Sequence, residues 1–225
     1  KWPQMAWWDE AWFSDYLDRI GERNGYNSDR RWMVLQLVRL TSSLEGDTAE
    51  CGVFQGAGSE LILRATGGTD SLRPHHLFDS FEGLSQPGER DGGHWSPGDL
   101  ACAEDVVAGN LSAWKARLVF HKGWIPETFR LSESTRFRFV HVDVDLYEPT
   151  RDAIAWFYSR LVPGGIFVCD DYGFTTCPGA TSACNEFLAD KPEKMIALCS
   201  GGGFFIKGTA TESTSGIEAL ATGNR

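Results

Sequence analysis

Two acidic clusters near the end of the chain carry the residue types best suited to bind a metal ion. The first lies in His141-Val142-Asp143-Val144-Asp145 and the second is Asp170-Asp171, and each follows a short apolar run with strand composition. Carboxyl ends of parallel strands meet at one edge of an open α/β sheet, so these carboxylates should emerge together. Carboxylates that lie close together raise one another's pKa, so we expect a hard divalent cation between them.

A glycine-rich segment earlier in the chain is a second candidate binding element. Glu50-Cys51-Gly52-Val53-Phe54-Gln55-Gly56-Ala57-Gly58-Ser59 follows a predicted strand and leads into a helix that we expect to begin at Ser59. Its glycines allow a ligand to approach the backbone, and free N–H groups at the helix start attract a carboxylate or phosphate. The segment fits neither G-x-G-x-x-G nor the P-loop pattern, so an ordinary tight turn is the alternative interpretation.

Asp79 ends the next predicted strand, within Leu77-Phe78-Asp79-Ser80-Phe81. An acidic residue at this strand end commonly accepts hydrogen bonds from a ribose diol, which indicates an adenosyl ligand. The interval of 29 positions from Glu50 exceeds the ~20 that is typical of dinucleotide enzymes. Alternatively, Asp79 caps the turn that follows it.

The elements that must position these residues alternate between short β runs and helical stretches, which is typical of βαβ units. We expect parallel strands near 48–53, 75–79, 117–121, 137–143 and 165–170, and helices near 6–22, 29–44 with Ser28 as N-cap, 59–66, 102–114, 150–161 and 179–190. Strands at 194–199 and 204–207 flank Ser200-Gly201-Gly202-Gly203, a hairpin signal. The predicted fold is α/β, with a mostly parallel seven-stranded sheet, a C-terminal antiparallel hairpin and helices on both faces.

We divide the chain into an N-terminal helical segment at 1–45, a main α/β domain at 46–208 and a flexible tail at 209–225. The 83–99 loop is too long for a plain connection, and long loops in compact domains are often lids. His94 and Trp95 lie on this loop, where they could close over a ligand or form a solvated tip.

Composition narrows the possible partners. A net charge of −10, from 21 basic and 31 acidic residues, disfavours nucleic acid. No apolar stretch approaches the ~20 residues that span a bilayer, and no signal pattern opens the chain, so we expect a cytoplasmic protein that binds no membrane. Six cysteines without a CxxC pair indicate reduced thiols. Trp2, Trp7, Trp8 and Trp12 are packing residues or form a substrate or subunit surface, so a homo-oligomer is left open, as is what precedes Lys1.

Four motifs in this order resemble the macrocin O-methyltransferase family. They are Glu50 to Gly56, Phe78 to Leu84, Val142 to Thr150, and Pro163-Gly164-Gly165 followed by Asp170-Asp171-Tyr172. The resemblance covers about residues 28–207 and implies a Rossmann-like class I methyltransferase fold. It also implies transfer of a methyl group from S-adenosylmethionine to a sugar hydroxyl of a natural product, with Mg²⁺ binding the acceptor diol. Phe54 and Gln55 stand where family members vary, and Pro149 replaces a commoner serine.

The resemblance also implies roles for individual residues. Asp143, Asp170 and Asp171 would hold Mg²⁺, and Asp145 would be the general base, unless Asp145 instead accepts hydrogen bonds at the start of the helix near Pro149. Residues assigned to the cofactor are Glu50, Gly52, Phe54, Gly56, Ser59, Asp79, Ser80, Gly123 and Trp124, with Trp124 at the adenine ring or else in the core. Residues assigned to the substrate or lid are His94, Trp95 and Tyr147. We expect His141 to be a packed core histidine.

Two other functions are compatible with parts of this pattern. Asp143-Val144-Asp145 satisfies the DxD pattern of metal-dependent glycosyltransferases that use nucleotide sugars. A non-catalytic binding protein could keep the methyltransferase-like fold. The glycosyltransferase class does not explain the glycine segment, Asp79 and the second acidic pair together, and a decayed enzyme would be expected to have lost some of the four candidate carboxylates. The acceptor, expected to be a small glycoside or sugar, is left open.

Overall fold

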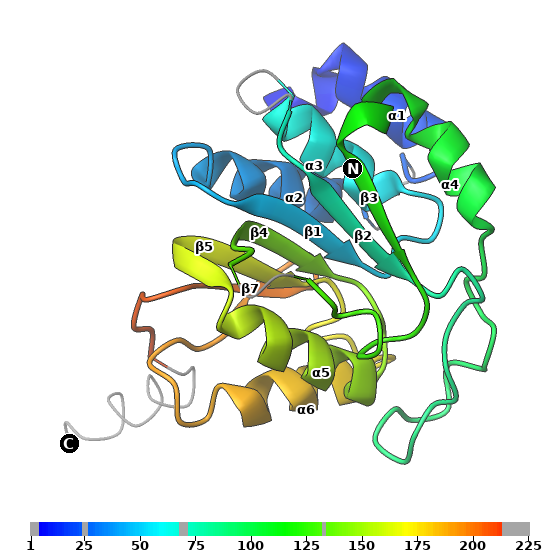
Figure 1. Cartoon of the computed structure of the whole chain (residues 1–225). Helices are drawn as coiled ribbons and strands as arrows, with labels where there is room; N and C mark the ends of the chain where they lie inside the picture. The colour runs from blue at the N-terminus through cyan, green and yellow to red at the C-terminus, as the bar shows by residue number, and fades with distance from the viewer. Residues whose placement is uncertain (1–4, 24–26, 68–71, 132–133, 213–225) are drawn as a thin grey trace.

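A seven-stranded sheet forms the middle layer of the protein (Figure 1). The computed structural model describes residues 5–23, 27–67, 72–131 and 134–212. The strands are β1 (Asp47–Cys51), β2 (His75–Asp79), β3 (Leu118–Lys122), β4 (Phe137–Val142), β5 (Leu161–Cys169), β6 (Ile196–Ala197) and β7 (Gly203–Ile206), in the order β3-β2-β1-β4-β5-β7-β6. The first five strands pair in parallel, and β7 is antiparallel to both β5 and β6. The predicted sheet and its C-terminal antiparallel hairpin are confirmed.

Helices cover both faces of this sheet (Figure 1). The helices α2 (Ser28–Leu40) and α3 (Ala57–Thr66) lie on one face, and α5 (Tyr147–Tyr158) and α6 (Pro178–Phe187) lie on the other. The apolar side chains of α2 pack on Phe139, Ile166 and Val168 of the sheet, and those of α5 and α6 pack on Val140, Phe167 and Phe205. The sheet is therefore buried on both faces, as its apolar strands require.

The N-terminal segment packs onto this core. A 3₁₀ turn, η1 (Ala6–Asp9), precedes α1 (Ala11–Arg19), whose buried Phe13, Tyr16 and Leu17 cluster with Leu61 of α3. Trp7, Trp12 and Trp32 surround this cluster, so they are packing residues, whereas Trp2 lies outside the described residues. The proposed boundary between residues 45 and 46 stays a prediction, although α2 shares the core of the main domain.

Two predicted helices are each divided in the structure. The helix expected at 6–22 is interrupted because Glu10 is extended, with ψ of 106°. The helix expected at 102–114 becomes α4 (Glu104–Asn110) and the 3₁₀ segment η2 (Ser112–Arg117). Helical propensity alone does not report such breaks, since single residues between two short helices decide them.

Three predicted boundaries also move, for reasons of backbone chemistry. The strand β5 begins at Leu161 and runs through Pro163-Gly164-Gly165, with Gly164 at φ of +83° where the register to β4 shifts. The helix α5 begins at Tyr147, since a proline such as Pro149 is tolerated in a first turn, where its missing N–H has no intrahelical partner. Ser28, predicted as the N-cap, is instead the first residue of α2, and Asn27 precedes the helix. The Ser28 hydroxyl donates to the Glu22 carbonyl at 2.9 Å and does not cap the helix.

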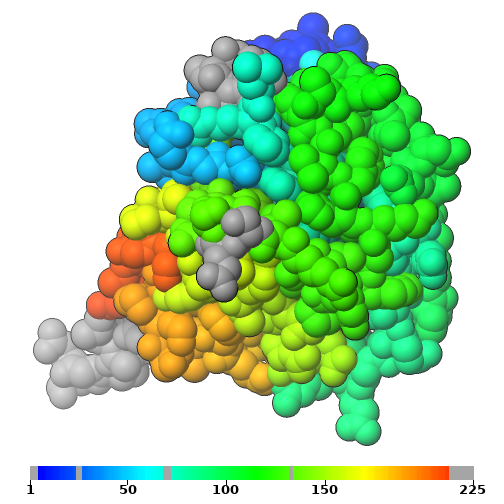
Figure 2. All heavy atoms as spheres, in the orientation of Figure 1, coloured from blue at the N-terminus to red at the C-terminus, as the bar shows by residue number. Residues whose placement is uncertain are grey.

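The molecular surface places the remaining segments. In Figure 2 the blue N-terminal segment lies at the top, and the blue-green 83–99 loop projects at the lower right. Residues 213–225 of the predicted tail lie outside the described residues. Within the part of the chain that the structure describes, no helix has the length and apolar character needed to cross a membrane.

Candidate active site

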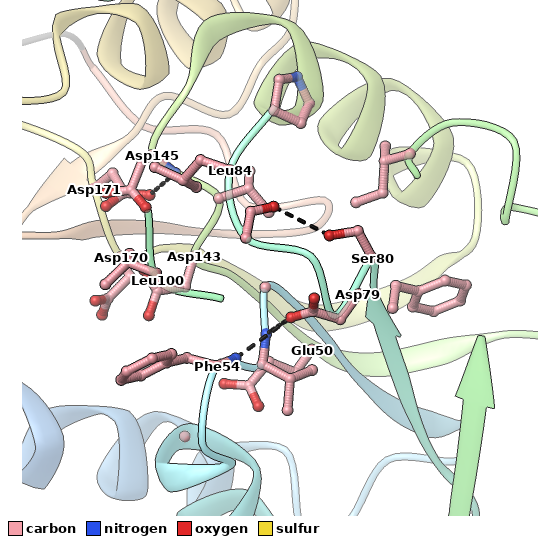
Figure 3. A pocket seen from close by; sticks show the side chains of 18 of the residues that line it. Glu50, Phe54, Asp79, Ser80, Leu84, Leu100, Asp143, Asp145, Asp170 and Asp171 are labelled. Atoms are coloured by element: carbon pink, nitrogen blue, oxygen red, sulfur yellow. Dashed lines mark hydrogen bonds between the residues drawn. The ribbon is translucent and has the colours of Figure 1, made fainter. Parts of the chain in front are cut away.

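A cavity of about 680 Å³ opens at the carboxyl ends of β1, β2, β4 and β5. It lies where the strand order reverses between β1 and β4, the position at which open α/β sheets bind ligands. Figure 3 shows Asp143, Asp145, Asp170 and Asp171 gathered on one side, with Asp79 and Ser80 on the other. We call these the β4–β5 side and the β1–β2 side. The volume falls within the roughly 300–1,000 Å³ of small-molecule sites.

The glycine segment between β1 and α3 is shaped by the protein's own atoms. Gly52 has φ of +76°, and a Cβ there would collide with the carbonyl oxygen of Asp143. A Cβ at Gly58 would collide with the Glu50 carboxylate. These two glycines therefore allow strands β1 and β4 and helix α3 to approach one another, a role that the sequence interpretation had given to a ligand. Helix α3 begins at Ala57, two residues before the predicted Ser59, and Ala57 and Gly58 line the cavity.

Asp79 holds the glycine segment in place at the end of β2. Its Oδ2 accepts hydrogen bonds from the backbone N–H of Val53 at 2.6 Å and of Phe54 at 3.4 Å, and its Oδ1 accepts from the N–H of Phe81 at 2.6 Å. A carboxylate has about four acceptor positions, so one position on Oδ1 is left for a ligand hydroxyl. Asp79 lines the cavity, and it both caps its own turn and offers this open position.

The other residues assigned to the cofactor separate into two groups. Gly52, Phe54, Ser80, Gly123 and Trp124 line the cavity, and the side chain of Trp124 is 40% exposed and so is not a core residue. Gly56 and Ser59 do not line it. The Ser59 hydroxyl is fully buried and donates to Glu50, which removes it from the reach of a ligand.

Glu50 lines the cavity, but its carboxylate is engaged inside the protein. One oxygen accepts from Ser59, and the other lies 2.8 Å from His141 Nδ1, while the residue is 1% exposed. The direct cofactor contact predicted for Glu50 stays a prediction; in the structure its carboxylate joins β1 to β4 and α3. These two partners use two of the roughly four acceptor positions of the carboxylate.

A buried hydrogen-bond chain extends from this carboxylate in both directions. His141 Nε2 lies 3.3 Å from Asp170 Oδ1, and Ser59 Oγ lies 2.9 Å from His75 Nε2, whose Nδ1 lies 2.8 Å from the Thr48 hydroxyl. The pairing of β1 with β2 places Thr48 opposite His75, and the pairing of β1 with β4 places Glu50 opposite His141. These two strand pairings therefore align the side chains of the hydrogen-bond chain. His141 is fully buried, as expected, and it connects the two sides of the cavity.

The two histidines of this chain have opposite charge states. Burial lowers the pKa of His75 to about 3, so the imidazole is neutral. Burial would also lower the pKa of His141, but hydrogen bonds to Asp170 and Glu50 outweigh it and raise the pKa to about 10. With this pKa His141 is an imidazolium whose two N–H groups face Glu50 and Asp170.

The four aspartates of the β4–β5 side belong to two groups of candidate metal ligands. Within each group, the candidate ligand atoms lie within 4.8 Å of one another. Asp143 and Asp170 converge with His141, and Asp145 and Asp171 converge with Cys177. The three aspartates predicted to hold an ion are therefore divided between the groups. Asp171 Oδ2 accepts from the backbone N–H of Asp145 at 2.8 Å, which joins the two.

Negative charge on this side is only partly compensated. Burial and the neighbouring Asp170 raise the pKa of Asp143 to about 8, and burial raises that of Asp145 to about 6. Burial and Asp143 also raise the pKa of Asp171 well above its usual range. Burial would raise the pKa of Asp170 too, but Arg30, 2.8 Å from its Oδ2, and His141 lower it. For Asp143 and Asp145, the nearby cations His141, Arg31 and Arg30 thus do not offset burial and the neighbouring carboxylates.

Asp145 has an unusual backbone, with φ of +59°, and it is 5% exposed. A non-glycine residue in this region is strained, and such strain concentrates at functional sites. The alternative role of Asp145 at the helix start is not what the structure contains, because the N–H of Tyr147 in the first turn of α5 donates to Asp91 Oδ1 at 2.6 Å. The Asp145 carboxylate instead accepts from the Cys177 thiol.

The 83–99 loop contributes one of its two aromatic candidates to the cavity. Trp95 lines it, whereas His94 is exposed and touches only the edge of the Trp95 ring, with centroids 4.6 Å apart. Tyr147 does not line the cavity, and its hydroxyl donates to Glu186 of α6 at 2.8 Å. The substrate contacts predicted for His94 and Tyr147 are therefore not supported by their positions.

Sequence reasoning missed three residues that shape the site. Arg30 forms an ion pair with Asp170, and the Cys177 thiol donates a hydrogen bond to Asp145. Asp91 accepts a hydrogen bond from the backbone N–H of Tyr147 at the start of α5. Each comes from a segment without a motif, and each contact joins residues more than thirty positions apart. The one available signal was a carboxylate, Asp91, within a glycine-rich loop, and that composition is ordinary for loops.

Comparisons with known proteins agree on one family. The family model described as macrocin O-methyltransferase matches residues 33–197. The chain is 32% identical over 194 residues to a tetracenomycin-C rhamnosyl 4′-O-methyltransferase of Streptomyces olivaceus, covering 78% of this chain and 71% of that protein. It is 29% identical to demethyldecarbamoylnovobiocin O-methyltransferase of Streptomyces niveus, covering 72% of this chain and 66% of that protein.

Solved structures with the same architecture are also O-methyltransferases. The O-methyltransferase NovP superposes with a TM-score of 0.67 at 26% identity, covering 82% of this chain and 83% of NovP. A calicheamicin methyltransferase superposes with a TM-score of 0.71 at 20% identity, covering 83% and 81% of the two chains. At that identity the second likeness concerns the fold, which is the predicted class I methyltransferase fold.

Proposed function

We propose, from the premise that the chain belongs to the macrocin O-methyltransferase family and is an O-methyltransferase, that it methylates a sugar hydroxyl using S-adenosylmethionine and a divalent cation. The family membership sets aside the glycosyltransferase interpretation of Asp143-Val144-Asp145. It also sets aside a binding protein without catalysis. Localisation and oligomeric state stay predictions.

One observation carries this proposal. A single cavity brings the open carboxylate position of Asp79 and the exposed ring of Trp124 to one side, and four incompletely compensated aspartates to the other. Two ligands of different chemistry fit such a site, a nucleoside on the first side and a cation with its hydroxyl ligand on the second. The acidic lining alone would explain only the cation.

The β1–β2 side suits an adenosyl group. S-adenosylmethionine supplies a methyl group on a sulfonium, which is a good leaving group. Asp79 Oδ1 would accept a ribose hydroxyl, the Trp124 indole would cover the adenine ring, and the free N–H groups at Ala57 and Gly58 would face the carboxylate of the methionyl end. Glu50 would face the ligand from the cavity lining, and the Ser59 side chain would hold Glu50 in place without touching the ligand.

The donor chemistry of the β4–β5 side suits a hard cation such as Mg²⁺. The three aspartates that we assign to the ion offer carboxylate oxygens, and burial together with the neighbouring carboxylates raises the pKa of Asp143, Asp145 and Asp171, so a cation would stabilise their ionised forms. Asp143 and Asp170 would hold the ion, with Asp171 as the third ligand after adjustment of its contact to Asp145. A bound divalent cation would orient the acceptor diol and lower the pKa of its hydroxyl.

Asp145 is the proposed base. Its pKa of about 6 leaves it ionised at neutral pH and still basic enough to accept a proton from a hydroxyl of lowered pKa. As the acceptor oxygen bonds to the methyl carbon and the carbon–sulfur bond breaks, the hydroxyl proton passes to the Asp145 carboxylate. The residues of the cavity mainly align oxygen, methyl and sulfur.

The relatives indicate what acceptor to test, since two of them are named for glycosylated tetracenomycin and novobiocin substrates. Purified protein should be incubated with methyl-labelled S-adenosylmethionine, Mg²⁺ and a panel of such glycosides. We expect label in a sugar hydroxyl of at least one glycoside, and loss of transfer when EDTA is in excess. Undiminished transfer in EDTA would remove the cation from the proposal, and labelling of the aglycone alone would remove the sugar.

A further inference from the structure

We infer that Cys177 is a positioning residue that connects the 83–99 loop to the carboxylate of Asp145. Trp95 Nε1–H donates to Cys177 Sγ at 3.3 Å, and the Cys177 thiol donates to Asp145 Oδ1 at 3.5 Å. This inference rests on the proposed role of Asp145 as base. Nothing in the four sequence motifs singles out Cys177.

Burial gives the thiol a fixed place among its partners, which besides Trp95 and Asp145 include the Thr176 hydroxyl at 3.7 Å. Cys177 is 3% exposed and precedes the first turn of α6, where its backbone N–H donates to the Phe174 carbonyl at 3.1 Å. Its side chain belongs to the main core cluster, and the Trp95 ring packs against that cluster. A thiol both accepts and donates a hydrogen bond, which lets one side chain join an indole N–H to a carboxylate.

The carboxylate of Asp145 depends on this contact for its direction. The strained backbone of Asp145 is held through its N–H, which donates to Asp171 Oδ2. Two side chains hydrogen-bond the carboxylate itself: the Cys177 thiol, which links it to the 83–99 loop, and the neighbouring Asp171. Without the thiol donor the carboxylate could rotate about its side-chain torsions and lose its alignment with an acceptor hydroxyl, which is a positional loss.

The loop end of the connection is also anchored. Asp91 is 3% exposed and accepts from the N–H of Tyr147 at 2.6 Å and of Gly88 at 2.7 Å. Arg90 forms two hydrogen bonds to Glu186 of α6, at 2.7 and 2.9 Å. The loop is therefore tied to α5 and α6, and this attachment determines where Trp95 meets the thiol.

The test compares Cys177→Ala with Cys177→Ser in methyl-transfer assays on the whole protein. Removal of one hydrogen bond to an ionised group should lower kcat roughly tenfold. The affinity for S-adenosylmethionine, measured by calorimetry without acceptor, should not change, because the thiol contacts none of the β1–β2 residues. Serine keeps an acceptor and a donor, so Cys177→Ser should recover most of the lost rate.

Cys184→Ala is the matched control, since Cys184 is a buried thiol on α6, the helix that Cys177 precedes, and does not line the cavity. It should lose stability to a similar extent and keep the kcat of the unmodified protein. A wild-type kcat in Cys177→Ala would overturn the inference. So would a Cys177→Ser variant as slow as Cys177→Ala, because packing alone would then explain the loss.

A double variant tests whether the three residues act as one chain. Trp95→Phe keeps an aromatic ring and removes the N–H donor. Combined with Cys177→Ala, it should be no slower than Cys177→Ala alone, whereas multiplied losses would contradict a single connection. If the unmodified protein transfers no methyl group, the proposed function fails first; if it does and Cys177→Ala matches it, only the present inference fails.

Discussion

The two sides of the cavity use the same residue, aspartate, under opposite electrostatic conditions. Asp79 on the β1–β2 side receives three backbone hydrogen bonds, and its carboxylate is therefore satisfied before any ligand arrives. Asp143 on the β4–β5 side has burial and a neighbouring carboxylate that raise its pKa to about 8. The first side is preorganised for a neutral nucleoside. On the second side, the negative charge of the carboxylates is balanced only when a cation binds.

The largest expected effect of this difference comes from Asp143→Asn. Methyl transfer should fall by at least about 10³-fold, because a proposed ligand is lost. The metal-free protein should nevertheless unfold at a temperature about 2–4 °C higher, since about 1 kcal/mol of repulsion is removed. Activity assays and thermal unfolding in EDTA measure both.

Asp105→Asn is the control for this substitution, because Asp105 is exposed on α4 and does not line the cavity. It should change neither quantity appreciably. Lower stability of metal-free Asp143→Asn would contradict the contrast between the two sides, even if activity were lost.

The same substitution at Asp79 should have the opposite effect on stability. An asparagine directs its NH₂ group at one of the backbone N–H donors, so the free energy of unfolding should fall by about 1–2 kcal/mol. Affinity for S-adenosylmethionine should fall about tenfold, since the acceptor for the ribose is altered. Denaturant unfolding and calorimetric titration provide the two values, and an unchanged affinity would remove Asp79 from the cofactor site.

A third expected effect concerns pH and the two histidines of the buried chain. The pKa of His75 falls from about 6.5 unfolded to about 3 folded, so its contribution to stability is present above pH 6.5 and is lost toward pH 3. The pKa of His141 is about 10 when folded, so its contribution is present below pH 6.5 and is lost toward pH 10. Each slope is at most about 1.4 kcal/mol per pH unit.

Denaturant unfolding in EDTA across this pH range, with His75→Gln and His141→Gln, separates the two contributions. The His75 variant should flatten the acid limb and the His141 variant the alkaline limb. A flattening of the same limb by both variants would show that the histidines share one charge state, contrary to the hydrogen bonds of His141 to Glu50 and Asp170.

Much of the fold could be predicted from the sequence because its signals are local. The runs at 137–140 and 165–168 are apolar and end in acids, so they specify strands and the edge where Asp143 and Asp170 meet. The hairpin at the end follows from its glycines. The start of β5 was misplaced because Pro163-Gly164-Gly165 has turn composition, and only the pairing with β4 keeps it in the sheet.

The site was less predictable because side-chain partners come from distant parts of the chain. Glu50 was expected to contact a ligand, and its hydrogen bond to His141, 91 positions away, was not expected. Tyr147 has the right motif, but its direction is set by Glu186 on another helix. The glycines were correctly recognised as places of close approach, although what approaches Gly52 is the Asp143 carbonyl, which no local pattern reveals.

The central claim is that the β4–β5 side binds a divalent cation, and it can be tested without knowing the acceptor. Thermal unfolding of the unmodified protein and of Asp143→Asn should be compared in EDTA and in excess Mg²⁺. We predict that Mg²⁺ raises the unfolding temperature of the unmodified protein, by mass action on the folded state, and has no such effect on the variant. Equal unfolding temperatures of the unmodified protein in EDTA and Mg²⁺, or an equal rise in both proteins, would contradict the claim.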